Sequence, residues 1–134
     1  MLSIFDIDMN SLVLSHHASR PASSVIDFAV IQTNISNIWY DSNRSIQIKC
    51  VDSDRSECID IGLDGDMVII WQYFIDGKHT LERVWVPMKD YTEETFFMES
   101  TVTDFGSLTF EYYKKVLALY REVMRIIRTA EGKD

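Results

Sequence analysis

The sequence predicts an α+β fold in which an antiparallel β-meander of five to six strands is covered on one face by a C-terminal amphipathic helix. Residues 57–86 contain three apolar runs joined by Asp64-Gly65 and Asp76-Gly77. Asp-Gly between apolar runs is a strong hairpin signal, because the turn residues must tolerate positive φ. After residue 107 the apolar spacing changes from that of a strand to that of a helix. The 134 residues, 46% of them hydrophobic, are expected to form one domain over residues 1–134.

The N-terminal third carries weaker signals. Alternating apolar and acidic residues predict a first strand over residues 1–8, continued by residues 12–14, and the Ser-rich stretch over residues 16–24 predicts a loop. Ser24 and Asp27 are spaced like a capping box, so a short helix is expected over residues 25–34. The β-branched residues in that segment favour a strand instead.

Strand patterns dominate from residue 35 to Pro87. Strands are expected over residues 35–40 and 45–51, followed by the three strands of the hairpin region, the last of which ends at Pro87. The middle strand, residues 67–75, is apolar or aromatic at nearly every position and is predicted to be packed on both faces. We interpret the aromatic residues of this strand, and the one Trp of the strand that follows it, as residues of the hydrophobic core. These residues are Trp71, Tyr73, Phe74 and Trp85.

The C-terminal part combines one further strand with the closing helix. Residues 95–103 are rich in Thr, Phe and Val, which predicts an edge strand. From residue 107 onward the apolar side chains recur on one helical stripe, which is expected to lie on the sheet. The stripe consists of Leu108, Tyr112, Tyr113, Val116, Leu119, Tyr120, Val123 and Ile127.

Composition narrows the range of functions. The first residues contain two acids and no basic region, and no apolar run is long enough to cross a bilayer, so a cytoplasmic protein that does not bind membranes is expected. Free thiols are expected at Cys50 and Cys58. The net charge of −8 disfavours nucleic acid as a partner and favours a basic one. The charge is uneven, because residues 1–106 hold 17 acids against 7 Lys and Arg.

No motif for catalysis, metal or cofactor binding emerges. Asp52-x-Asp54 resembles the opening of a calcium loop, but Glu57 and Leu63 occupy the positions where Gly and Glu are needed. The three histidines and two cysteines match no zinc spacing. A nucleophile elbow and a glycine-rich phosphate loop are both missing from the sequence. The chain is therefore expected not to be an enzyme and to hold no metal or cofactor.

The feature with functional potential is a run of acids. Six acids within fifteen positions would create a negative potential that attracts and orients a cationic protein surface. The alternative is a solvated, charged sheet edge that prevents strand addition, and both interpretations remain open. The six candidate partner-binding residues are Asp52, Asp54, Glu57, Asp60, Asp64 and Asp66.

The second half of the chain resembles the immunity proteins of bacterial contact-dependent growth inhibition and related polymorphic toxin systems. The matching features are the aromatic-rich hairpin MVIIWQYFIDGKHTLERVWVP, the acidic link after it and a closing helix rich in Tyr and Leu. The resemblance implies a small cytoplasmic inhibitor, expected to be monomeric, that caps a cognate toxin domain, often a nuclease with a basic cleft. Two alternatives are a phage-encoded inhibitor that mimics nucleic acid and an acidic, usually dimeric, secretion chaperone.

Overall fold

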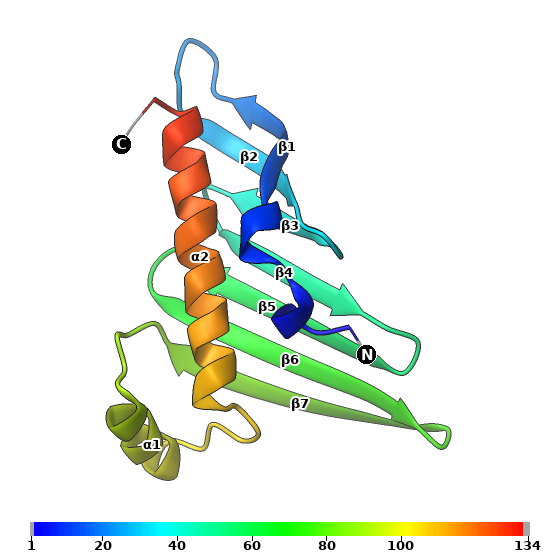
Figure 1. The fold of residues 1–134 in the computed structure, drawn as a ribbon. Coiled ribbons are helices and arrows are strands. Elements are labelled where there is room, and N and C mark those ends of the chain that lie inside the picture. The colour runs from blue at the N-terminus through cyan, green and yellow to red at the C-terminus, as the bar shows by residue number, and fades with distance from the viewer. Residues whose placement is uncertain (1, 133–134) are drawn as a thin grey trace.

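The computed structural model describes residues 2–132, and these form seven β-strands, two α-helices and two short 3-10 helices (Figure 1). The strands lie side by side in chain order, each antiparallel to the next, as expected for a meander. The predicted number of five to six strands was too small, because the N-terminal region contributes two strands rather than one strand and a helix. The strands are β1 (Val13–Ser19), β2 (Ile26–Gln32), β3 (Asn37–Asp41), β4 (Ser45–Val51), β5 (Arg55–Gly62), β6 (Asp66–Ile75) and β7 (Lys78–Pro87).

The helix α2 (Phe110–Ala130) crosses one face of this sheet, with the 3-10 helices η1 (Ile4–Asp6) and η2 (Met9–Ser11) beside it (Figure 1). Its predicted apolar stripe is confirmed, with most members buried against the sheet. The buried helix residues are Tyr112, Tyr113, Val116, Leu119, Val123 and Ile127. The sheet residues that face them are fully buried, and include Ile46, Ile48, Ile59, Ile61, Met67 and Ile69. One core therefore fills the space between α2 and the sheet.

The strand β6, which lies next to the edge strand β7, is packed on one face alone. Met67, Ile69 and Trp71 are buried toward α2, whereas Val68 and Ile70 alternate with them and stay partly exposed on the other face. The prediction that this strand is covered on both sides is therefore wrong. Core packing of the aromatic residues is confirmed for Trp71, and Tyr73 is partly buried against the core, but Phe74 and Trp85 are 57% and 63% exposed.

The N-terminal residues form turns instead of the strand predicted over residues 1–8. The Ser3 hydroxyl accepts a hydrogen bond from the Phe5 amide, and the Asp6 carboxylate accepts one from the Ser3 amide, which completes a capping box around η1. Ile4 and Ile7 are buried beside α2. The first residue of the predicted strand, Met1, lies outside the described residues.

The helix predicted over residues 25–34 is the strand β2. Its apparent capping residue, Asp27, forms an ion pair with Arg20 in place of capping a helix. The β-branched residues prefer extended backbone because their side chains are restricted in a helix. The adjacent strand β1 includes His16 and His17, which were expected in a loop, and both are exposed.

The edge strand predicted over residues 95–103 is the helix α1 (Glu93–Val102). Thr92 and Thr95 form a capping box, in which the Thr92 hydroxyl accepts from the Thr95 amide at 3.1 Å. Glu93 and Glu94 then lie in the first turn, where negative charge stabilises a helix. This N-terminal signal, rather than the Thr, Phe and Val content, decides the local structure.

Both cysteines are free, as predicted, and they point to opposite faces of the sheet. Cys50 pairs with Glu57 on the covered face, and Cys58 pairs with Lys49 on the other. Burial is the main reason why the pKa of the Cys50 thiol is raised to about 11. Burial likewise raises the pKa of Tyr112 and of Tyr113.

We expect the protein to lose stability as the pH rises above about 9. A raised folded-state pKa means that the contribution of Cys50 is complete below the ordinary thiol pKa of 9.0 and is lost as the pH approaches about 11. Urea unfolding between pH 8 and pH 11 measures this effect. Cys50→Ala should reduce the slope by at most about 1.4 kcal/mol per pH unit. Identical slopes for both proteins would contradict the assignment.

Candidate binding surface

The second face of the sheet carries the candidate site. Within residues 2–132, both α-helices and both 3-10 helices lie on or beside the core face, which leaves this face uncovered (Figure 1). Several large apolar side chains of the sheet are at least 40% exposed, among them Phe28, Trp39, Phe74, Leu81 and Trp85. Exposed apolar residues that share one face are typical of an interaction surface. We refer to this side of strands β2 to β7 as the open face.

One row of side chains crosses the open face at a single level. The strand register places Trp39 opposite Gln47, Gln47 opposite Asp60, Asp60 opposite Val68, and Val68 opposite Trp85. Neighbouring strands are about 4.8 Å apart, so the row spans about 19 Å. A tryptophan stands at each end, and shorter side chains lie between them. The row is therefore the floor of a trough with two aromatic walls.

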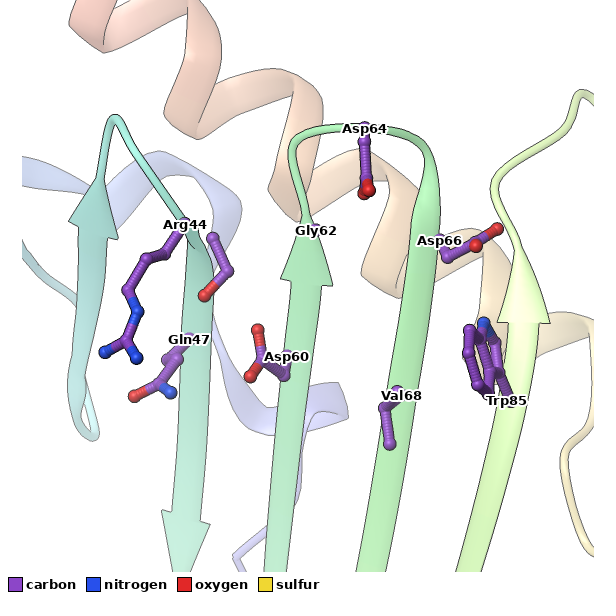
Figure 2. A pocket seen from close by; sticks show the side chains of 9 residues that line it. Arg44, Gln47, Asp60, Gly62, Asp64, Asp66, Val68 and Trp85 are labelled. Carbon is purple, nitrogen blue, oxygen red and sulfur yellow. The ribbon is translucent and has the colours of Figure 1, made fainter.

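A hollow of about 430 Å³ occupies the Trp85 side of this trough (Figure 2). Gly62, the last residue of β5, has no side chain, and a Cβ at that position would lie 2.6 Å from Oδ1 of Asp64. The Asp64 carboxylate thus extends over the glycine. The lining consists of Arg44, Ser45, Gln47, Asp60, Gly62, Asp64, Asp66, Val68 and Trp85. A second hollow of about 180 Å³ adjoins it on the Trp39 side and shares Arg44, Ser45 and Gln47.

Within residues 2–132, the charged side chains that line the larger hollow form no ion pair. Among the described residues, the carboxylates of Asp60, Asp64 and Asp66 accept no hydrogen bond and form no ion pair. The ion pairs of the described residues all lie outside the hollow. They are Arg20–Asp27, Arg55–Glu57, Lys89–Glu99, Arg121–Asp90 and Arg125–Glu122. Figure 2 shows the one lining cation, Arg44, on the β4 side of the hollow, away from Asp66 and Trp85. The three acids and Arg44 give the hollow a formal charge of −2.

The six predicted acids do not form one surface. Asp60, Asp64 and Asp66 gather around the hollow, but Asp52 and Asp54 lie in the β4–β5 loop at the other end of β5. An eight-residue strand is about 25 Å long, which separates the two groups. Hydrogen bonds from the Leu2 and Ser53 amides hold the Asp52 carboxylate and lower its pKa.

Glu57 was predicted to bind a partner, but its side chain is completely buried on the covered face of the sheet. Its carboxylate accepts hydrogen bonds from the Ile4 amide at 3.1 Å, from Nη2 of Arg55 at 3.0 Å and from Nε1 of Trp71 at 3.2 Å. After burial, the Glu57 charge is the largest reason why the pKa of Tyr112 is raised. Glu57 therefore joins η1 to the sheet and does not contact a partner at the surface.

The two tryptophans of the trough were missed as site residues. Trp85 alternates with Val84 and Val86, which are both buried, so strict strand alternation places Trp85 on the opposite face. The same argument applies to Trp39 between Ile38 and Tyr40. The alternation of these residues along the strands was a signal in the sequence that both tryptophans are exposed. The signal was missed because aromatic residues were assigned to the core.

Comparison with family models, with curated proteins and with solved structures gave no match to this chain. Among the described residues, no group of three or more His, Cys, Asp or Glu is arranged to hold a metal ion. None of the helices over residues 2–132 combines the length and apolar character needed to span a membrane.

Proposed function

We propose that this protein is an immunity protein, which binds and neutralises a basic toxin domain of the nuclease class by way of the open face. The observation that carries the proposal is the trough, where an uncovered sheet face meets three acids that form no ion pair within the described residues. The resemblance of the aromatic hairpin and closing helix to immunity proteins of polymorphic toxin systems supports the same function.

The chemistry of the surface fits recognition of a basic protein. Carboxylates placed where phosphates would bind can occupy the cleft of a nuclease, and negative charge at the rim of an interface speeds association. Exposed tryptophans supply the apolar contact area that interfaces use for affinity. Inhibition of this kind requires no catalytic residue, cofactor or metal of the protein itself. The protein is expected to act as a monomer in the cytoplasm.

Growth rescue tests this function. The gene next to that of this protein is expressed as its candidate toxin domain in a bacterial host, with and without the protein. We expect wild-type protein to restore growth and to form a complex with the purified toxin domain. Asp60→Lys should abolish rescue, because it reverses a charge in the centre of the trough.

The matched control is Asp54→Lys, which makes the same charge change in the β4–β5 loop, outside the trough. This variant should rescue growth as well as wild type does. Failure of wild type to rescue growth or to bind the toxin domain would contradict the proposal. Equal loss of rescue by both variants would contradict the role of the open face.

An acidic secretion chaperone is the second candidate, and the surface of α1 favours it. Phe97, Met98 and Val102 are 68%, 61% and 86% exposed on this helix. Chaperones of this class expose apolar residues to an unfolded client and usually pair through a large interface. Light scattering separates the two functions, because a stable dimer would favour the chaperone and a monomer the inhibitor. A nucleic-acid mimic would use the same acids on a different target, which the growth test distinguishes.

A further inference from the structure

The geometry points to an arginine side chain of the partner protein as the group that enters the hollow between Trp85 and Asp60. This inference deepens the proposed function by naming the chemistry that the open face recognises. The guanidinium would lie on the indole of Trp85 while the acids of the hollow accept its hydrogen bonds.

The shape of the hollow favours a long side chain that enters from outside the sheet. Val68, Asp60 and Gln47 form the floor in consecutive strands, with Trp85 rising at one side (Figure 2). Gly62 follows Asp60 on the open side of β5, and its φ does not lie in the left-handed region, so the backbone there does not demand glycine. A side chain at this position would collide with the Asp64 carboxylate, so Gly62 leaves room for that carboxylate at the edge of the hollow.

The polar groups match a cation rather than a neutral group. Asp60, Asp64 and Asp66 approach the hollow from β5, from the β5–β6 turn and from β6 (Figure 2). A guanidinium is planar, carries five donors, and binds carboxylates in a bidentate manner while stacking on an indole. A lysine ammonium is more strongly hydrated and lacks the flat face that stacks on Trp85. Arginine thus satisfies both the aromatic and the acidic side of the site.

Arg44 is the internal competitor for these acids. It lines both hollows, and it stands on the β4 side of the trough, where it lowers the negative charge without filling the space beside Trp85 (Figure 2). Removing its charge should therefore strengthen the attraction for a cation from outside. Arg44→Gln is expected to bind an arginine peptide more tightly than wild type does.

The experiment is an NMR titration with the peptide Ac-Gly-Arg-Gly-NH2. We expect it to shift the indole signal of Trp85 and the amide signals of Asp60 and Val68, but not the indole signal of Trp71, which is buried on the covered face. The same peptide with citrulline in place of arginine keeps the shape and removes the charge. It should cause no comparable shifts, and a lysine peptide should bind about threefold or more weakly.

Variants locate the site. Trp85→Leu and Asp60→Asn should each weaken arginine binding by about fivefold or more, whereas Asp54→Asn should leave it unchanged. Retained dispersion of the amide spectrum verifies that each variant is folded. Equal binding of the arginine and citrulline peptides, equal binding of the lysine peptide, or wild-type affinity in Trp85→Leu would overturn the inference. Growth rescue without arginine binding would refute this inference alone, whereas arginine binding without rescue would refute the proposed function alone.

Discussion

Replacing Glu57 with alanine is expected to lower the free energy of unfolding by about 3–5 kcal/mol, because it leaves a charged partner and two further donors without their acceptor. The carboxylate is fully buried and holds Arg55, whose side chain is 19% exposed, and Nε1 of Trp71. It also accepts from the Ile4 amide. Urea unfolding at neutral pH measures the loss.

Two further variants distinguish the contribution of the Glu57 charge to stability from that of the side-chain shape and from that of a nearby exposed carboxylate. Glu57→Gln keeps the shape of the side chain and one acceptor oxygen, so its cost should fall between that of the alanine variant and wild type. Asp54→Ala removes an exposed carboxylate from the nearby β4–β5 loop and should change stability by no more than about 0.5 kcal/mol. Hydrogen exchange at the Ile4 amide should accelerate in Glu57→Gln. A cost below about 1 kcal/mol for Glu57→Ala would contradict the buried network.

Because β6 is packed on one face, we expect alanine substitutions on its two faces to change the free energy of unfolding by different amounts. Ile69→Ala is expected to cost about 2–5 kcal/mol, because the side chain is fully buried between the sheet and α2 and its removal leaves a cavity. The adjacent Ile70 points to the open face and is partly exposed. Ile70→Ala should therefore cost less than about 1.5 kcal/mol. Chemical denaturation of the two variants under one condition measures both values.

This pair forms a matched comparison, since the same substitution is made at neighbouring positions of one strand. The strand alternation that separates them also separates Val84 from Trp85 in β7. Similar costs for Ile69→Ala and Ile70→Ala would indicate that something covers the open face in solution. A dimer formed through that face would have this effect, and light scattering at the concentration of the unfolding experiment would detect it.

Local signals in the sequence determined much of the second half of the fold. The Asp76-Gly77 turn has positive φ at both residues, whereas only Gly65 does so in the Asp64-Gly65 turn. The strand over residues 45–51 and the buried stripe of α2 also follow from their apolar spacing. Such signals are sufficient because each depends on residues that are close in the chain. The run of acids was equally visible, and three of its six members line the hollow.

The tertiary structure alone decided which faces are covered and which acids share a site. Strand alternation divides the side chains between two faces and indicates the more apolar one, but only the position of α2 determines that the other face stays uncovered. Glu57 differs from Asp60 in burial for this reason, although both belong to β5. The trough depends on the register of five strands, which brings Trp39, Asp60 and Trp85 to one level from distant parts of the chain. Spacing along the sequence does not contain that alignment, because hydrogen bonds between strands create it.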